Sequence, residues 1–585
     1  MRAVDWIVFV LFLAYVVWDG IRRRAAAKDL DGYYAGGRSI PWWAAGLSIM
    51  ATQASAITVI GTTGQGHEHG MDFVQTYFGL PFAMVLLCIF LVPFYRSRAV
   101  LTPYELLEAR FGPVTRSLAS LIFLASRCLA LGFVIYAPSV ALSAMIGIET
   151  WQATLAVGLL TTLYTTIGGV AAVIWTDVKQ MVVILAGLLL VGFVLLRDLL
   201  PVFDFGQILD LCGAAGKLNA LEAEPASTSL WPRTLDMVSS EQGTPSFWEE
   251  KYNLWSGLFG GLFLHLSYFG CDHSQAQRLL TSKDADQSRK SLLLSAFAKV
   301  PMQSFVLLLG VLMWLFYSVH GQPLLYKTTQ VERAALPEYS QRMQEVQLRF
   351  DAALAERTAA MQLLAALPDG PASDRAALQR FQHSVIAVKD IRAEARTICS
   401  GEVDADGKPK DDKDTNDIFC RFILDQMPPV VLGLIIAAIF AAAMSSIDSV
   451  LNALSGATVV DFYRRWLRPD CSESHALRVG KVLTLLWGAL ATAMAMFLGG
   501  GGSVVELINQ YGSFFYGSLL GIFALALFVP RAGGRAGTLG LLGGMASVLA
   551  VHYTLKVEFL WYNIIGCLGV LAVGGLVALF ARRPR

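Results

Sequence analysis

Charged side chains are scarce in this sequence. Only 16% of the 585 residues are Asp, Glu, Lys or Arg, whereas 55% are hydrophobic. Soluble domains carry about 25% charged residues, so this composition excludes an ordinary soluble globular protein. The net charge of +1 also excludes the basic footprint of a nucleic-acid-binding protein.

Cysteine motifs and a cleavable leader are missing as well. The eight cysteines contain no CxxC pair, so neither a zinc site nor a thioredoxin-like site is predicted. Arg2 is the only basic residue before the first apolar segment, Trp6–Trp18, whereas three arginines follow it at 22–24. No small-residue cleavage site follows it, and we therefore expect a retained membrane helix.

Long apolar runs are abundant, and many reach the ~20 residues that a bilayer-spanning helix needs. We expect an all-α membrane protein with about thirteen transmembrane helices. The predicted spans are 4–20, 41–62, 73–95, 118–146, 151–167, 170–197, 252–271, 291–317, 428–458, 476–498, 503–529, 536–554 and 559–581.

Lys and Arg are unevenly distributed over the short loops. The basic loops are 22–28, 96–98, 110–116, 277–290, 462–468, 529–535 and 581–585. Almost no Lys or Arg occurs at 64–72, 147–150 and 499–503. Basic loops stay in the cytoplasm, so the pattern predicts a multi-pass protein of the plasma (bacterial inner) membrane, with its N-terminus outside and its C-terminus cytoplasmic. His67, Glu68 and His69, in one outer loop, lack metal-site spacing and are expected to be solvated.

Residues 320–427 form a polar insertion on the predicted outer side. Apolar residues recur at helical spacing near Val346 and Phe350 and again over 378–391, with a PDGP turn between the two stretches. The pattern predicts an extracytoplasmic helical hairpin, which either binds an unknown partner or simply decorates a loop. Cys399 and Cys420 lie outside in this topology, where a disulfide is permitted; whether they pair is left open.

Polar residues interrupt the apolar run at 428–458. Ser445, Asp448, Ser449 and Asn452 fall at i, i+3, i+4 and i+7, on one helix face. Ionisable groups at this depth usually face a cavity or an ion path, and hydroxyl and carboxylate oxygens are ligands for a hard cation. Serines that pack between helices are the alternative, although packing does not need the Asp448 carboxylate.

The second predicted span holds a similar stretch, SIMATQASAIT at 48–58. A broken helix there would free backbone carbonyls that can coordinate sodium, and a polar packing face is the alternative. Further along, GGVAAVIWTDVKQ at 168–180 places Asp177 after a Gly-Gly break, where a helix cap or dipole partner is the simpler role.

These stretches, with LTPYELLEARFG at 101–112 and SSIDSVLNALS at 445–455, resemble the sodium/solute symporter family. Its members are sodium-coupled carriers of sugars, proline, sialic acid, iodide, monocarboxylates and vitamins. The resemblance implies an inverted-repeat core of five plus five helices whose first helices are broken. It divides the chain into an extra N-terminal helix and loop (1–36), the first repeat and the start of the second (37–319), the insertion (320–427), the rest of the second repeat (428–530) and two C-terminal helices (531–585).

The resemblance also implies ligands for sodium, which is the expected ion. The principal site would combine backbone carbonyls with hydroxyls, from Ala51, Ala54, Ala442, Ser445 and Ser446. A second sodium would fall on Asp177, Ser445, Asp448 and Ser449. Asp448 stands where a hydroxyl is usual, so it could strengthen a second cation site, carry a proton or pair with another residue.

The solute cavity of the family matches Gln53, Ser55, Thr58, Tyr268, Lys299 and Asn509. Tyr268 corresponds to an aromatic that closes the inner gate of a sodium/galactose relative, and Lys299 and Asn509 correspond to sugar contacts there. Ile57 and Thr58 replace a carboxylate and an amide that such carriers use, which argues against galactose.

Arg127 lies a third to halfway along an apolar predicted helix. An unpaired arginine at that depth costs several kcal/mol, so it should face a cavity or a partner, and arginine binds carboxylates bidentately. Sialic-acid carriers of the resembling family also hold a carboxylate with an arginine on this helix. We therefore hypothesise an organic anion or acidic sugar as solute. The alternative is a structural arginine paired with Asp448, Asp177 or a carbonyl.

The prediction is a sodium-coupled secondary active symporter, embedded in the lipid bilayer, that imports a small organic solute. A carrier of a neutral sugar or another neutral solute is an alternative within this class, and a membrane sensor or receptor is an alternative outside it. An enzyme is not expected, because no metal-ligand spacing appears and His265 and Ser267 do not share a helix face.

Overall fold

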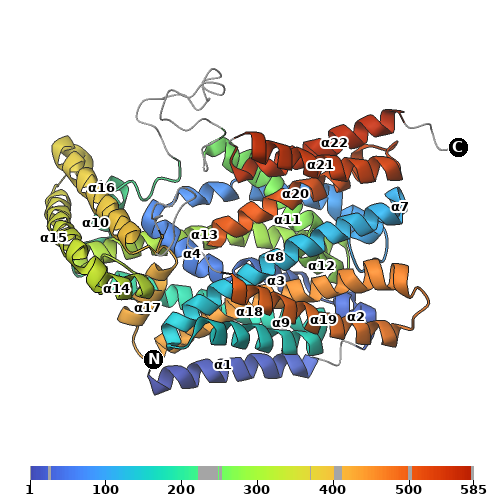
Figure 1. Ribbon diagram of the computed structural model, residues 1–585, viewed down its shortest axis with the longest axis horizontal. Helices are drawn as coiled ribbons and strands as arrows, with labels where there is room; N and C mark the ends of the chain where they lie inside the picture. The colour runs from blue at the N-terminus through green and yellow to red at the C-terminus, as the bar shows by residue number, and fades with distance from the viewer. Residues whose placement is uncertain are drawn as a thin grey trace.

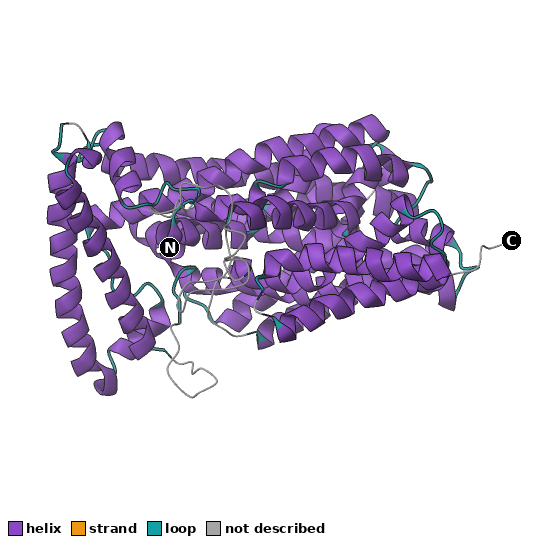
Figure 2. Ribbon diagram, turned by 90° about the horizontal axis from the view of Figure 1, so that it is seen from above, coloured by secondary structure: helices purple, strands orange, loops and turns teal. Residues whose placement is uncertain are grey.

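The computed structural model describes residues 2–23, 28–221, 248, 253–368, 370–400, 412–498, 504–555 and 557–580. The long helices lie roughly along one axis and form an elongated bundle (Figure 1), and within these ranges every regular element is a helix (Figure 2). The long helices are α1 (Ala3–Arg22), α8 (Pro113–Ile146), α9 (Thr150–Leu199), α13 (Ala285–His320), α18 (Val431–Ala457), α19 (Glu473–Phe497), α20 (Val504–Phe528), α21 (Gly534–Thr554) and α22 (Tyr562–Phe580). Shorter helices include α2 (Leu30–Ala35), α5 (Leu80–Leu86), α6 (Val92–Arg96), α7 (Tyr104–Phe111) and α10 (Phe205–Ala214).

In the described chain, 10 helical segments are long and apolar enough to cross a membrane, or 11 if the bent pair α3 (Trp42–Gln53) and α4 (Ala56–His69) counts as one span. The predicted all-α membrane fold is confirmed at this level. The number is lower than about thirteen because α9 counts once although it covers two predicted spans, and because the predicted span 252–271 is not among these segments. The count of thirteen stays a prediction.

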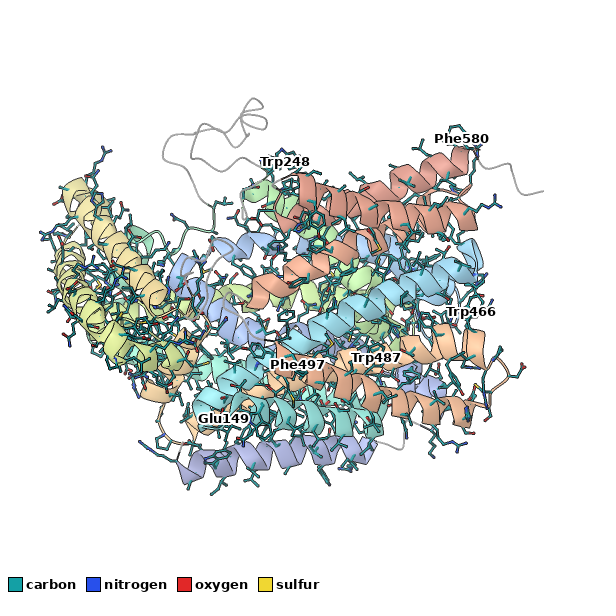
Figure 3. All side chains as sticks on the ribbon, viewed as in Figure 1. Glu149, Trp248, Trp466, Trp487, Phe497 and Phe580 are labelled. Atoms are coloured by element: carbon teal, nitrogen blue, oxygen red, sulfur yellow. The ribbon has the colours of Figure 1, made fainter. Side chains whose placement is uncertain are left out.

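α9 runs along the bundle twice. Its 50 residues would extend about 75 Å as one straight helix, more than twice the ~30 Å hydrocarbon core. Gly169, with φ 63° and ψ −173°, breaks the helical backbone, in a region that only glycine adopts readily. Glu149, just before α9, lies at the same end of the bundle as α10, which follows α9 (Figures 1 and 3). The chain therefore turns back at Gly169.

Two helices are interrupted inside the bundle. α3 and α4 meet at a 59° bend, and Ala54 between them has the non-helical values φ −80° and ψ 53°. The break predicted in the stretch 48–58 is therefore present. A second interruption, at Asp272, separates α11 (Gly261–Cys271) from α12 (His273–Thr281). α11 continues without a gap from the π-helix Ser256–Gly260, whereas α12, with 9 residues, is too short to span a bilayer alone.

The two ends of the bundle differ in what they carry. α1 begins at the end that carries α10 and the helices of the 320–427 segment, whereas α22 ends on the opposite side, where Phe580 lies (Figures 1 and 3). Trp466, which follows Arg464 and Arg465, lies at the α22 end as well (Figure 3). Opposite ends for the first and last helices imply an odd number of passages through the bundle.

The segment 320–427 contains a helical hairpin. α15 (Pro337–Ala365) and α16 (Arg375–Ile398) pack side by side, flanked by α14 (Thr328–Ala334) and α17 (Asp417–Gln426) (Figure 1). Val346, Phe350 and Val388 share a small buried apolar core. The helical period read from the sequence thus identified the correct local structure.

Cys399 and Cys420 do not form a disulfide; both thiols are free. Cys399 contacts the sulfur of Met343 at 3.5 Å, and Cys420 lies 3.6 Å from the carbonyl of Asn416 in its own helix. The possible bridge between them is therefore not formed.

Two predictions about loops are wrong. His67, Glu68 and His69 end α4 instead of forming a loop; His67 is only 2% exposed, beside Tyr326 of the 320–427 segment, whereas His69 is exposed as predicted. The basic stretch 277–290 begins inside α12, where Arg278 is 0% exposed. Hydropathy misplaces α12 because polar side chains such as Gln277 and Arg278 have hydrogen-bond partners inside the bundle. The predicted loops 499–503 and 581–585, and most of 22–28, lie outside the described residues.

Candidate functional site

The α3–α4 break lies against α18. The hydroxyl of Ser445 donates to the carbonyl of Ala51, and that of Ser446 donates to the carbonyl of Thr52, each at 2.9 Å. Both hydroxyls also lie near the carbonyl of Ala442, at 3.1 and 3.3 Å. The structure thus brings most of the predicted sodium ligands together, and Ala54, the remaining one, is the non-helical residue of the break.

This group of oxygens suits a sodium ion. Carbonyls at the end of α3 have lost their partners in the next helical turn, and here serine hydroxyls satisfy them. Carbonyl and hydroxyl oxygens are the hard, neutral ligands with which broken membrane helices coordinate sodium. The bond from Ser446 to Thr52 adds a carbonyl that the sequence did not predict as a ligand.

Arg278 lies among the residues predicted to hold a second sodium. Its Nη2 donates to the hydroxyl of Ser449 and lies 3.6 Å from Oδ2 of Asp177. Asp177 also accepts a hydrogen bond of 2.5 Å from the hydroxyl of Ser48. A guanidinium group therefore already compensates the charge of Asp177 within the predicted second site.

Asp448 has a partner of its own. Its carboxylate accepts a hydrogen bond from the hydroxyl of Tyr164, on the first arm of α9, and one of 3.2 Å from Ser449. Of the roles left open for Asp448, pairing with another residue is therefore the one present in this structure.

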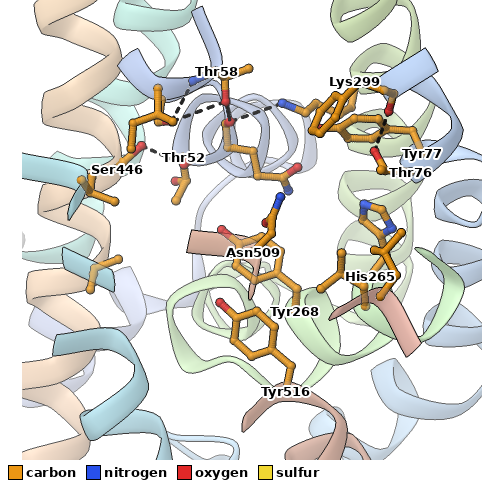
Figure 4. A pocket seen from close by; sticks show the side chains of 18 of the residues that line it. Thr52, Thr58, Thr76, Tyr77, His265, Tyr268, Lys299, Ser446, Asn509 and Tyr516 are labelled. Carbon is orange, nitrogen blue, oxygen red and sulfur yellow. Dashed lines mark hydrogen bonds between the residues drawn. The ribbon is translucent and has the colours of Figure 1, made fainter. Parts of the chain in front are cut away.

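All of the predicted substrate residues line one cavity of about 160 Å³ (Figure 4). They are Gln53, Ser55, Thr58, Arg127, Tyr268, Lys299 and Asn509. Thr52 and Ser446 line the cavity as well. The group of oxygens at the α3–α4 break and the cavity therefore share a wall.

Two basic side chains line the cavity. Arg127 and Lys299 line it, and no aspartate or glutamate belongs to the described lining. Lys299 is only 2% exposed; its Nζ donates to the carbonyl of Gln53 at 3.3 Å and lies 5.9 Å from the ring centre of Tyr77. Neither of these partners is a carboxylate.

Arg127 is paired, but not with the residues considered from the sequence. Its Nε donates to Oδ2 of Asp272 at the α11–α12 break. The guanidinium carbon lies 4.9 Å from the ring centre of Tyr268 and 5.2 Å from that of Tyr516. The alternative pairing with Asp448 or Asp177 is therefore wrong, while Arg127 still lines the cavity.

Several cavity residues were missed by the sequence analysis. Tyr516 follows Asn509 by two helical turns on α20, and His265 precedes Tyr268 by about one turn on α11, so each shares a face with a predicted residue. Helical spacing from the predicted residues could therefore have identified Tyr516 and His265. Tyr77, in the irregular turn before α5, carries no such signal.

The family model for the sodium:solute symporter family matches residues 33–323 and 404–544. The chain belongs to this family. The residues between the two matched segments, 324–403, fall within the segment that carries the hairpin.

Individual similar proteins support the assignment of this symporter to the family. The sodium-dependent multivitamin transporter of Oryctolagus cuniculus is 26% identical over 93% of this chain and 69% of its own length. The sodium/sialic acid symporter of Proteus mirabilis is 24% identical over 99% of this chain and 95% of its own length. A solved structure of a Na⁺-coupled sialic acid symporter, in a substrate-bound outward-open state, shares the fold with a TM-score of 0.73 at 24% identity, over 100% of both chains.

Membership in the family decides the class of protein. The symporter is a multi-pass membrane transporter coupled to sodium, and it is not an enzyme. The predicted recognition, ion and class of activity are confirmed by this assignment.

Proposed function

We propose that the symporter imports an organic anion, such as an acidic sugar, together with sodium. The basic lining of the cavity carries this proposal, because Arg127 and Lys299 line it and no described lining residue is acidic. A solute carboxylate would form charge-assisted hydrogen bonds with these groups in a site largely shielded from water. The similar symporters that are named for sialic acid support an acidic sugar as the first solute to test.

The two cationic groups stand on different sides of the cavity. In Figure 4 Lys299 lies near Thr58, whereas Tyr268 and Tyr516, which flank Arg127, lie across the cavity with Asn509 between. The Arg127 side would receive the carboxylate, because a planar guanidinium matches it. Lys299 and Asn509 would then bind hydroxyl groups farther along the solute.

Sodium is proposed to bind the oxygens of Ala51, Ala54, Ala442, Ser445 and Ser446, with the carbonyl of Thr52 as a further ligand. An ion there would hold the α3–α4 break against α18 and order Gln53 and Ser55, which flank the break and line the cavity. Two ligands that favour the same conformation raise each other's affinity. Asp177, Asp448 and Ser449 remain a proposed second ion site, which a sodium ion would share with Arg278.

We propose about thirteen crossings in an inverted-repeat arrangement. Both arms of α9 and the broken pairs α3–α4 and α11–α12 would each be spans. The end with Arg464 and Arg465 would face the cytoplasm, because basic loops stay inside. The hairpin would then lie on the outer side of the plasma or bacterial inner membrane.

A neutral solute is the second candidate. Asp272 compensates the charge of Arg127, and uncharged amide and hydroxyl groups of Gln53, Thr58 and Asn509 supply much of the polar lining. On this alternative only Lys299 would remain charged in the cavity.

Uptake into proteoliposomes with an inward sodium gradient separates the two candidates. We expect labelled sialic acid or lactate to accumulate and glucose not to accumulate. Lys299→Gln should raise the half-saturating concentration of the anion about tenfold, because a hydrogen bond to a charged group contributes about 1.5–3 kcal/mol.

The matched control is Lys481→Gln. The Lys481 ammonium lies 5.8 Å from the ring centre of Tyr33, away from the cavity, so anion uptake should be unchanged. Accumulation of glucose without either anion would contradict the anionic solute and favour the neutral one.

A further inference from the structure

Asp272 connects the α11–α12 break with Arg127 on α8. Its side chain is only 1% exposed. Oδ1 accepts hydrogen bonds from the backbone N–H of Ser274, at 2.8 Å, and from the Ser274 hydroxyl, at 2.5 Å. Oδ2 accepts from Nε of Arg127. One carboxylate therefore caps the start of α12 with one oxygen and holds a buried cation with the other.

One hydrogen-bond donor of Arg127 has no acceptor among the described residues. The residue is 5% exposed, and its Nη2 has no hydrogen-bond partner among the described residues. Tyr268 and Tyr516 contact the guanidinium through their rings, which supports the cation without accepting its N–H bonds along the plane. Because Arg127 lines the cavity, this buried donor indicates an acceptor that arrives with a ligand.

We propose that Asp272 is the positioning residue of Arg127. Before a solute binds, Asp272 neutralises the guanidinium and holds it between the two tyrosine rings. A solute carboxylate then accepts a hydrogen bond from Nη2 and weakens the Arg127–Asp272 bond. The second half of this inference rests on the proposed anionic solute. Asp272 cannot follow Arg127 into the cavity, because its other oxygen is retained by Ser274.

The consequence is a link between solute charge and the α11–α12 break. Two carboxylates competing for one guanidinium repel each other, and Lys299 across the cavity offsets the added negative charge. A weakened Arg127–Asp272 bond loosens the attachment of α8 to the broken helix. Anion binding thereby favours movement at Asp272, whereas a neutral solute leaves the pair intact.

A double-mutant cycle without any solute tests the positioning role. The melting temperature is measured in sodium buffer for wild type, Arg127→Gln, Asp272→Asn and the double variant. Asparagine keeps the cap on α12 and removes the charge. We expect each single variant to lower the melting temperature. The double variant should melt at or above the temperature of the less stable single variant. Additive losses would overturn the positioning role, whatever the solute is.

Uptake of sialic acid tests the competition. Asp272→Asn leaves Arg127 uncompensated, so the half-saturating concentration should fall about tenfold while the maximal rate falls, because release of the anion is slowed. Asp272→Asn should have no further effect in the Arg127→Gln background. Ser274→Ala, which removes a contact to Asp272 but no charge, should leave the half-saturating concentration near that of wild type.

A raised or unchanged half-saturating concentration in folded Asp272→Asn would overturn the competition. If wild type transports glucose and no anion, the proposed solute class fails and the competition with it, while the melting cycle still decides the positioning role. If Asp272→Asn does not fold, Asp272→Ser, which also caps a helix, takes its place in both experiments.

Discussion

Ser445 and Ser446 illustrate how single residues define the ion site. Each hydroxyl satisfies a carbonyl that the α3–α4 break leaves without a helical partner. An alanine at either position would leave that carbonyl unsatisfied and would remove one oxygen from the sodium ligands. The two serines therefore support both the local packing and the proposed binding of sodium.

Sodium should stabilise the wild-type symporter in detergent relative to choline at equal ionic strength. Ligand at a hundred times its dissociation constant adds about 2.7 kcal/mol. Ser445→Ala or Ser446→Ala should shift the sodium concentration that gives half of this stabilisation upward, about tenfold or more. The measurement is melting temperature against sodium concentration.

Ser455→Ala is the matched control for this titration. Ser455 is also buried on α18, but its hydroxyl bonds to the carbonyl of Gly480 and to Tyr34. We expect Ser455→Ala to lower the melting temperature without changing the sodium dependence. Equal sodium dependence in all three serine variants would show that the ion binds elsewhere.

Arg278 sets the charge balance beside the ion site. Its guanidinium is fully buried between Asp177 and Ser449, and removing one partner of a buried ion pair costs about 3–5 kcal/mol. Arg278→Gln should therefore lower the melting temperature strongly. Asp177→Asn in the same chain should restore part of the loss, and a double variant even less stable than Arg278→Gln would argue against the pair.

The residues of the site were only partly predictable from the sequence. Ser445 and Asp448 stand out because polar groups interrupt an apolar run, and Arg127 stands out for the same reason. Arg278 and Asp272 do not, because a short polar stretch after an apolar one looks like a loop to hydropathy. Their partners lie more than a hundred residues away in the chain, and only the folded bundle brings them together.

At the scale of elements, breaks in helices create the polar centre. The carbonyls of Gly270 and Cys271, freed at the α11–α12 break, accept hydrogen bonds from the hydroxyls of Tyr95 and Tyr104. At the α3–α4 break the serines of α18 take this role. Irregular backbone is tolerated inside a membrane protein where such partners or a cavity satisfy it.

The hairpin helices are attached to α4 by buried charges. Glu68 lies 3.8 Å from Arg392 and 3.9 Å from Arg396, and it accepts a hydrogen bond of 2.8 Å from Thr415. Nη2 of Arg392 also donates to both carboxylate oxygens of Asp414, at 2.8 and 2.9 Å. This network ties α4, one half of the broken helix, to the segment that the family model does not match.

Glu68→Gln should loosen the hairpin, because it leaves buried arginines with less negative charge. We expect protease cleavage within α15 and α16 to become about tenfold faster, which corresponds to an opening equilibrium easier by about 1.4 kcal/mol. Native-state proteolysis followed by mass spectrometry measures this rate.

Glu394→Gln provides the control within the hairpin. Glu394 bonds to Arg349 on the surface, with both side chains substantially exposed, and such pairs contribute about 0–1 kcal/mol. Its cleavage rate should stay near that of wild type. Indistinguishable rates for the two glutamate variants would contradict a structural role for the Glu68 network.

Helices were more predictable than their connections. Long apolar runs predicted α8, α13 and α18 near their observed positions, although buried polar residues interrupt them, and helical spacing predicted the hairpin. The polar helix α12 was missed, and so was the docking of His67 and Glu68, because tertiary contacts bury Arg278 of α12, His67 and most of Glu68. The sequence carries no local sign of such contacts.

In the molecule as a whole, the proposed ion site and the solute cavity lie side by side and share residues. The carbonyls at the α3–α4 break, the serines of α18 and the cavity residues Gln53 and Ser55 belong to one contiguous region. A sodium ion bound there would order the wall that contacts the solute. Coupling follows because both ligands stabilise the same arrangement.

The most direct test is uptake of sialic acid or lactate, whichever accumulates, measured in proteoliposomes with sodium or choline outside at constant pH. Accumulation above the external concentration should require sodium and should be largely lost in Ser445→Ala and Ser446→Ala, but not in Ser455→Ala. Equal accumulation with choline in place of sodium would contradict the account.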